Sequence, residues 1–284
     1  MPRRIAFLNE KGGSAKTTLT ANLGAYLALR RGHRVLGIDM DPQGQLGKVL
    51  GAKPRALRRS ALDLLLDAIL EEDPVEAASV VGESEAVASR ADLPVVQTRI
   101  ANLDLILANK ALGLAPGFGG DVPDPTGRLE RRLAAAPELR RYDFVLLDCP
   151  PSFSALTLTV LRAVDEIVIP VPLTFLALDG CAQLMQTIET VRTRYGHTRL
   201  RIAMIVPTFY RRTRLANEVL ELLKSRFPKE IAQTVVGLHV KIDEAQSRGL
   251  SVFEYAPRDR GALSLAALAE ELEARRPAAE GEPM

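Results

Sequence analysis

The chain has 284 residues, a formal net charge of +2, 47% hydrophobic and 25% charged residues, a composition that excludes an intrinsically disordered protein. Its two cysteines, Cys149 and Cys181, exclude a disulfide-stapled scaffold, and no apolar run reaches the ~18 residues of a membrane-spanning helix. The first residues, MPRRIAF, lack the apolar stretch of a secretion signal, so we expect a cytoplasmic protein with buried free thiols.

A strand–loop–helix–strand unit opens the chain. The apolar run at residues 4–9 predicts a buried strand, and the helical spacing of apolar residues over 17–31, stopped by Gly32, predicts a helix. The run RVLGID at residues 34–39 predicts a second buried strand. Such a unit implies parallel strands joined by a right-handed crossover.

The middle of the chain has a less regular pattern. We predict a helix at 60–70, a polar helix and loop at 71–94, a strand at 103–107, a Gly/Pro-rich loop at 115–126 and a helix at 128–136.

Strands and helices alternate again in the second half. We predict strands at 142–152, 165–173, 200–207 and 232–238, a helix capped by Asp179, a helix containing Leu215–Leu223, and a last helix at 262–276. This alternation indicates one α/β domain, residues 1–276, built on a doubly wound, mostly parallel sheet with helices on both faces. We expect residues 277–284, PAAEGEPM, to be a disordered tail.

The loop after the first strand, EKGGSAKTT, has the residues of a phosphate-binding loop. Gly12 and Gly13 permit close approach of the backbone to a phosphate, Lys16 would contact phosphate oxygens, and the Thr17 hydroxyl would ligate Mg²⁺. The usual pattern, GxxxxGK[ST], fails at positions 10 and 15, and a simple Gly-Gly turn followed by a solvated lysine is the alternative.

Three acids strengthen the nucleotide interpretation. Asp39 and Asp41 follow the second strand, and Asp148 ends a later one. Open α/β sheets bind ligands at the carboxyl ends of their strands, and carboxylates are preferred ligands of Mg²⁺. One acid would hold the metal through water and another would orient an attacking water. Each acid alone could equally be a turn or cap residue.

Three motifs resemble those of the ParA/MinD-type ATPases. KGGSAKTT is similar to their deviant Walker A motif, DMDPQG to Walker A′, and VLLDCPPS to Walker B and switch II. The later segments VPLTFLALDG, YRRTRLANEVLELL, HVKIDEAQSRG and YAPRDRGALSLAALAEEL are similar to further ParA segments, so the resemblance covers most of residues 3–273. It accounts for Glu10, because the signature residue of the deviant motif is Lys11, which in that family reaches the partner subunit's nucleotide.

The resemblance implies a P-loop ATPase with ATP and Mg²⁺ as cofactors. The catalytic residues would be Lys11, Lys16 and Asp41, and the metal would be held through Thr17, Asp39 and Asp148. The nucleotide would be bound by Lys11, Gly12, Gly13, Ser14, Ala15, Lys16, Thr17, Thr18, Pro207 and Thr208.

Charge is unevenly distributed along the chain. Residues 192–260 contain 14 Lys and Arg against 7 Asp and Glu, whereas residues 261–284 carry a net charge of −3. A basic segment suggests a polyanionic partner, although a solvated basic surface would give the same count. The acidic C-terminus differs from the basic amphipathic helix of membrane-bound MinD proteins, so we expect no membrane partner.

The resemblance further implies a homodimer when ATP is bound, non-specific binding of double-stranded DNA, and slow hydrolysis stimulated by a ParB-like activator. The function would be chromosome or plasmid partition on the nucleoid, or the positioning of another cargo. By motif and proximity, the DNA-binding residues would be Arg211, Arg212, Arg214, Lys241 and Arg248.

Several residues depart from the family pattern. Ala15 replaces a glycine, and if this position needs a positive φ the alanine costs roughly 1–2 kcal/mol. Lys241 replaces an arginine, Gln246 a proline and Ala256 an aspartate. Two other classes are an iron–sulfur reductase, which needs cluster cysteines at a dimer interface that the two cysteines here do not fit, and a nucleotide-binding scaffold without hydrolysis, which Ala15 leaves open.

Overall fold

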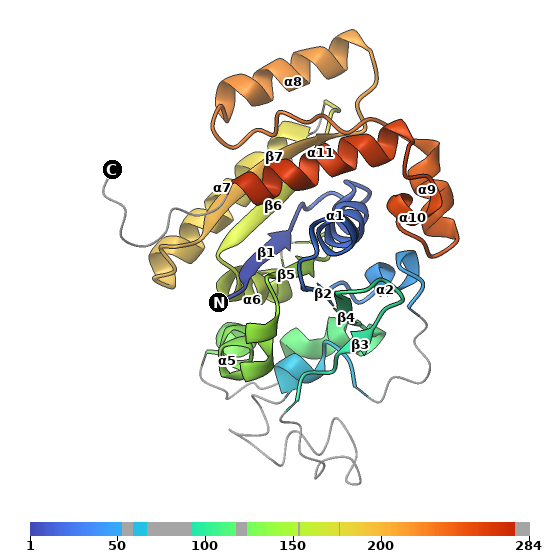
Figure 1. Cartoon of the computed structure of the whole chain (residues 1–284). Helices are drawn as coiled ribbons and strands as arrows, with labels where there is room; N and C mark the ends of the chain where they lie inside the picture. Colours follow the sequence, from blue (N-terminus) through green and yellow to red (C-terminus); the bar gives the residue numbers. More distant parts are fainter. Residues whose placement is uncertain (53–58, 67–91, 118–123, 153, 176, 276–284) are drawn as a thin grey trace.

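The computed structural model describes residues 1–52, 59–66, 92–117, 124–152, 154–175 and 177–275. Its centre is a seven-stranded sheet in the order β3-β4-β2-β5-β1-β6-β7 (Figure 1). All neighbouring strands pair in parallel except β3, which runs antiparallel to β4 at the edge. The strands are β1 Arg3–Phe7, β2 Val35–Asp39, β3 Val96–Gln97, β4 Leu103–Ile106, β5 Phe144–Asp148, β6 Glu166–Pro172 and β7 Arg201–Thr208.

Helices connect the strands and cover the sheet. They are α1 Lys16–Arg31, α2 Gln45–Val49, α5 Arg128–Ala135, α6 Ala155–Ala163, α7 Ala177–Arg194, α8 Arg214–Arg226, α9 Val240–Ser247, α10 Val252–Tyr255 and α11 Arg260–Ala274. Three short 3₁₀ helices are η1 Lys110–Gly117, η2 Pro125–Gly127 and η3 Pro137–Arg141.

Two apolar layers lie on opposite faces of the sheet. On one face, alternate strand residues such as Ile5 and Phe144 pack against α1, α10 and α11; on the other, residues such as Ile38 and Leu147 pack against α5, α6, α7 and α8. Because both faces are covered, β2, β5 and β6 are buried along their whole length. The predicted doubly wound α/β fold is therefore confirmed.

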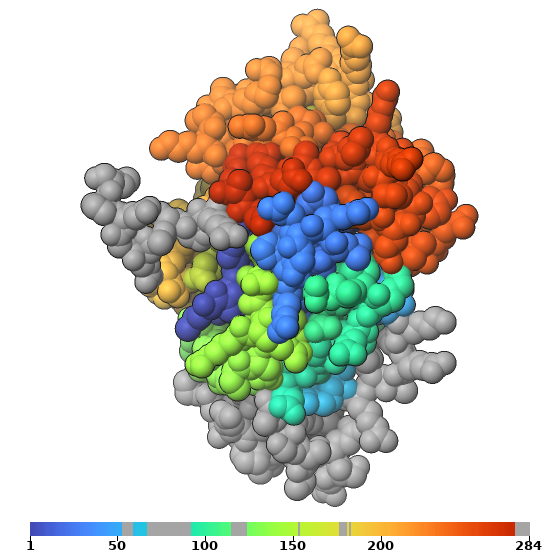
Figure 2. Space-filling view, viewed as in Figure 1, coloured from blue at the N-terminus to red at the C-terminus, as the bar shows by residue number. Residues whose placement is uncertain are grey.

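The C-terminal helix packs directly on the first helix. In the space-filling view, the residues of α1 (blue) lie against the C-terminal segment (red) (Figure 2). Leu265, Leu268 and Leu272 of α11 are fully buried in the same layer as Leu19 and Leu23 of α1. Burying each such leucine contributes roughly 1.5–3 kcal/mol, so this contact is a large part of the core.

Most predicted elements are present, but the prediction of a strand at 232–238 is wrong. That segment runs beside β7 but forms only isolated bridges, Ile205 to Ile231 and Tyr210 to Gly237. The reason is that the Glu271 carboxylate accepts hydrogen bonds from the backbone N–H groups of Gln233 and Thr234, which are therefore not available to a ladder.

Other boundaries differ from the predictions. Helix α7 begins at Ala177, so Asp179 lies inside the helix and is not its cap. Residues 115–117 of the predicted loop belong to η1, and α2 and α6 were not predicted. Of the predicted helix at 60–70, residues 63–66 are helical and residues 60–62 are not. Residues 67–70, most of 71–94, residues 118–123 and the predicted tail lie outside the described residues.

Candidate functional site

Parallel pairing brings the predicted acids to one edge of the sheet. Strand β5 lies between β1 and β2, and Asp148 pairs in register with Phe7 on one side and with Asp39 on the other. The loop that follows β1 therefore lies next to two carboxylates from neighbouring strands. This is the carboxyl edge at which open α/β sheets bind ligands.

The loop of residues 8–15 is fixed by Asn9, whose role the sequence did not reveal. Its side-chain amide donates to the Pro170 carbonyl at 2.6 Å, and its oxygen accepts from the Lys11 N–H at 2.9 Å. The Lys16 ammonium folds back and donates to the carbonyls of Asn9 at 3.0 Å and Lys11 at 3.2 Å. Burial lowers the pKa of Lys16, and the nearby Asp148 carboxylate opposes this shift.

Ala15 adopts the left-handed conformation that a glycine would adopt easily. Its φ is 80° and its ψ is 18°, immediately before the first residue of α1. The condition raised from the sequence, a positive φ at this position, is therefore met. An L-residue in this region is strained by roughly 1–2 kcal/mol, so the loop is held in its path by its surroundings.

Asp148 is fully buried at the base of this loop. One of its oxygens, Oδ2, accepts a hydrogen bond from the Thr17 hydroxyl at 2.7 Å, whereas Oδ1 has no hydrogen-bond partner among the described residues. Burial and the neighbouring Asp39 carboxylate raise the pKa of Asp148 well above its usual range. A buried carboxylate with one free oxygen, next to a threonine hydroxyl, is a donor set that fits a hard cation such as Mg²⁺.

The two Walker A′ acids are held differently. Both oxygens of the buried Asp39 accept backbone N–H groups, that of Asp41 at 3.1 Å and that of Leu46 at 3.0 Å. Asp39 therefore fixes the start of α2 as well as lying beside Asp148. Asp41 accepts from the Gln43 N–H at 2.9 Å and lines the pocket in front of the loop.

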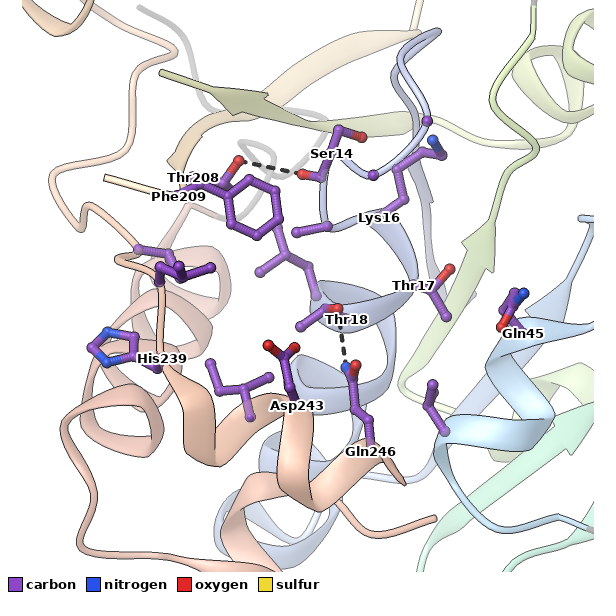
Figure 3. Close-up of a pocket in the computed structure, with 18 of the residues that line it drawn as sticks. Ser14, Lys16, Thr17, Thr18, Gln45, Thr208, Phe209, His239, Asp243 and Gln246 are labelled. Carbon is purple, nitrogen blue, oxygen red and sulfur yellow. Dashed lines mark hydrogen bonds between the residues drawn. The ribbon is translucent and has the colours of Figure 1, made fainter. Parts of the chain in front are cut away.

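A pocket of about 350 Å³ lies in front of the loop (Figure 3). One wall is formed by residues 12–19; the opposite wall is formed by residues from the end of β7, the segment that follows α8 and the helix α9: Thr208, Phe209, Val236, Gly237, Leu238, His239, Ile242, Asp243 and Gln246. The first wall is suited to phosphates and the second, which is largely apolar, to the nucleoside.

Two direct contacts tie the walls together. The Thr208 hydroxyl donates to the Ser14 carbonyl at 3.3 Å, and the Gln246 amide donates to the Thr18 hydroxyl at 3.0 Å (Figure 3). Pro207, which was also predicted to bind nucleotide, lies just behind Thr208 and accepts the Val236 N–H with its carbonyl. Nothing in the sequence pattern indicated Phe209 or residues 236–239, and Gln246 was noticeable only as a departure from the family pattern.

Comparisons with known proteins agree with this geometry. The family model described as an AAA domain matches residues 2–202. The sporulation initiation inhibitor protein Soj of Bacillus subtilis is 35% identical over 96% of this chain and 99% of its own length. The chromosome-partitioning ATPase Soj of Thermus thermophilus is 38% identical over 96% of each chain.

The chain belongs to the Soj/ParA family of ATPases. A solved structure of cobyrinic acid a,c-diamide synthase from Mycobacterium smegmatis, with an ATP analogue and magnesium, is also similar. Its TM-score is 0.73 at 28% identity, covering 95% of this chain and 93% of the other.

In this Soj/ParA-family chain, Lys11 lies on the surface beside the loop. Its side chain is exposed, and its ammonium donates to the Thr174 hydroxyl at 3.3 Å. The Lys11 side chain therefore lies exposed against Thr174, whereas Lys16 is buried in its own loop.

The residues predicted to bind DNA lie on two parts of this family member. Arg211, Arg212 and Arg214 are exposed in the segment leading into α8, where Arg214 pairs with Glu218 at 2.7 Å. Lys241 and Arg248, at opposite ends of α9, both flank the ring of Tyr255, at 5.8 Å and 5.2 Å from its centroid.

The cysteines do not resemble cluster ligands. Cys149 and Cys181 are both free and buried, and burial raises the pKa of each thiol, that of Cys181 to about 11. The part of the chain that the structure describes has no group of three metal-binding His, Cys, Asp or Glu residues. Within that same part, no helix combines the length and the apolar character needed to cross a membrane.

Proposed function

We propose that this family member is an ATP-dependent DNA-binding switch for chromosome or plasmid partition. The nucleotide part rests above all on Asp148, which holds the Thr17 hydroxyl with one oxygen and keeps the other free beside the phosphate loop. The partitioning part is supported by relatives named chromosome-partitioning ATPase that are similar over nearly the whole chain. Residues 1–276 would act as one ATPase domain.

Each side chain of the site has a distinct role in this proposal. The amides of residues 12–18 and the Lys16 ammonium bind the phosphates, since both present positive charge at the start of α1. Thr17 and Asp148 hold Mg²⁺, with Asp39 reaching it through water. Mg²⁺, when bound with ATP, neutralises phosphate charge. Asp41, which already faces the pocket, orients the attacking water.

The apolar wall binds the nucleoside and the surface residues act between molecules. Thr208 and Phe209, at the end of β7, contact the nucleoside part of ATP. Lys11 approaches the nucleotide of a second subunit, so the ATP-bound form is a homodimer. The exposed cations of α8 and α9 bind DNA phosphates, which gives affinity without reading the sequence. A ParB-like activator accelerates hydrolysis, and the protein accumulates on the nucleoid.

Retention of double-stranded DNA on the protein tests this proposal, with ATP, ADP or no nucleotide and with phosphate release measured in parallel. We expect retention of two unrelated sequences only with ATP. Lys16→Ala should lose both retention and phosphate release, because the phosphates lose their buried cation. Arg212→Glu should keep phosphate release and lose about tenfold or more in DNA affinity at low salt.

Arg194→Glu provides the matched control, because Arg194 is an exposed arginine of α7 outside the predicted DNA surface. It makes the same charge change and should leave DNA retention unchanged. Equal retention in every nucleotide state would refute the switch. ATP-dependent retention by wild-type protein without phosphate release would instead support a scaffold that does not hydrolyse ATP.

A further inference from the structure

Helix α9 stands between the nucleotide pocket and the proposed DNA surface. Ile242, Asp243 and Gln246 line the pocket, while Lys241 and Arg248 are exposed and flank Tyr255. The helix has eight residues and ends at Ser247, two residues before Gly249, whose φ is +66°. A helix this short is stabilised mainly by its tertiary contacts, so these contacts decide where its cations point.

The first contact joins α9 to the phosphate loop. The Gln246 side-chain amide donates to the Thr18 hydroxyl at 3.0 Å, one residue after Thr17 (Figure 3). Behind it, the Asn22 amide donates to the Thr18 carbonyl and the Asn22 oxygen accepts the Val252 N–H, both at 2.9 Å. Since Asn22 is buried, α1 is firmly joined to the last turn of α9 and to the first residue of α10.

The second contact joins α9 to the helix that follows the Walker A′ acids. Gly51, just after α2, and Gly249, just after α9, lie so close that a Cβ on Gly249 would come within 2.7 Å of the Gly51 Cα. Both residues have a positive φ, +67° and +66°. Helix α2 in turn is held at its start by the Asp39 carboxylate. The contact therefore leaves no room for side chains between the two helix ends.

We propose that Gln246 is a positioning residue that couples occupation of the nucleotide pocket to the placement of α9. A hydroxyl that accepts a hydrogen bond from an amide keeps its own proton free to donate. The Thr18 hydroxyl therefore accepts from Gln246 and donates to a phosphate oxygen of ATP, and the two bonds strengthen each other. ATP thereby tightens the Gln246–Thr18 bond and fixes the helix that carries Lys241 and Arg248.

This inference rests on the proposed function for its effect on DNA, but not for its effect on α9. Hydrogen–deuterium exchange of residues 240–249 measures the placement of α9 without DNA. We expect ATP to slow this exchange in the wild type. In Gln246→Met, which keeps the side-chain size and removes the amide, the ATP-dependent slowing should be lost even at concentrations where a fluorescent ATP analogue saturates the variant's nucleotide site.

The same variants are also compared in their affinity for DNA, with and without ATP. We expect Gln246→Met to lose about fivefold or more of the gain in DNA affinity that ATP produces, a typical size for coupling between two sites. Ser247→Ala is the matched control, because its hydroxyl donates to the Glu244 carbonyl on the same helix, away from Thr18. Gln246→Ala should give the same result as Gln246→Met. Agreement between the two variants shows that the defect comes from the lost amide and not from the introduced methionine.

The coupling through Gln246 and the proposed DNA-binding function would be refuted by different results. If ATP leaves the exchange of residues 240–249 unchanged in the wild type, or slows it equally in Gln246→Met, the coupling is wrong. If Gln246→Met lowers ATP affinity and DNA retention in proportion, Gln246 acts only through nucleotide binding and the coupling is again wrong. If the exchange responds as expected but the wild type retains no DNA, the coupling stands and the proposed function fails.

Discussion

At the scale of single residues, Ala15 is a residue of the phosphate loop whose backbone is under strain. Its φ of 80° places an alanine where the chain needs a left-handed turn into α1. The strain does not disturb the side-chain hydrogen bonds of the loop, because these are made by Asn9 and Lys16 and not by Ala15. The phosphate loop therefore has its working shape in spite of the methyl group.

Ala15→Gly should stabilise the protein. Glycine removes the strain of roughly 1–2 kcal/mol, and the extra freedom of the unfolded glycine offsets roughly 0.4–1 kcal/mol of this gain. We expect an increase of about 0.5–1 kcal/mol in the free energy of unfolding, measured by urea denaturation. Ala28→Gly, the same change at a buried position inside α1, should lower it by about 1 kcal/mol. Two changes of the same sign would contradict the strain at Ala15.

At the scale of elements, α9 and α10 carry an ion pair that competes with the proposed DNA contact. The Glu244 carboxylate accepts from the Lys241 ammonium at 2.7 Å and from the Tyr255 hydroxyl at 2.8 Å. The hydrogen bond from Lys241 lowers the pKa of Glu244, so the carboxylate stays charged near neutral pH. Lys241 is thereby neutralised within its own helix, as Arg214 is by Glu218 in α8.

Glu244→Gln should strengthen DNA binding, because Lys241 then has no competing carboxylate. We expect a severalfold gain in affinity at low salt and a dependence of log K on log salt that is steeper by about 1, as for one further phosphate contact. Glu221→Gln is the control, since it breaks a similar exposed pair with Lys224 on α8, outside the predicted surface. An unchanged salt slope in Glu244→Gln would remove Lys241 from the DNA surface.

Long, periodic elements and the acids at the sheet edge could be predicted because they depend on local pattern and parallel topology. A positive φ at Ala15 was raised only as a condition, because the glycine of the family motif does not by itself fix the backbone angle. Of the far wall of the pocket, Thr208 was predicted through the family resemblance, but the other residues could not be, because their contacts join distant parts of the chain, as Gln246 does with Thr18. The segment 232–238 has a strand-like pattern, but its hydrogen bonds to Glu271 depend on a helix that comes later in the chain.

At the scale of the whole molecule, α11 holds the back of the nucleotide pocket in place. Glu271 accepts two backbone N–H groups from the segment that leads to Val236, and it also pairs with Arg275 at 2.7 Å. The Arg275 guanidinium donates in turn to the carbonyls of Glu230 at 2.9 Å and Ile231 at 2.6 Å. The apolar wall of the pocket is thus anchored to the last described helix.

Glu271→Gln should destabilise the whole fold. The amide cannot accept all of these hydrogen bonds or pair with Arg275, and unsatisfied partners of this kind cost about 1–3 kcal/mol. Urea denaturation should show a loss in this range. Glu270→Gln, a neighbouring change at an exposed residue of the same helix, should cost less than about 0.5 kcal/mol. Equal losses in the two variants would show that Glu271 does not anchor the segment.

The distance along the chain between the two pocket walls has a consequence for synthesis. The first wall of the pocket, residues 12–19, leaves the ribosome before most of the sheet has been made. The facing wall, residues 236–246, emerges only after all seven described strands. A nascent chain therefore carries its nucleotide motif long before it has a pocket. We therefore expect a chain that lacks residues 236–246 to bind ATP more weakly than the whole protein, because the second wall of its pocket is absent.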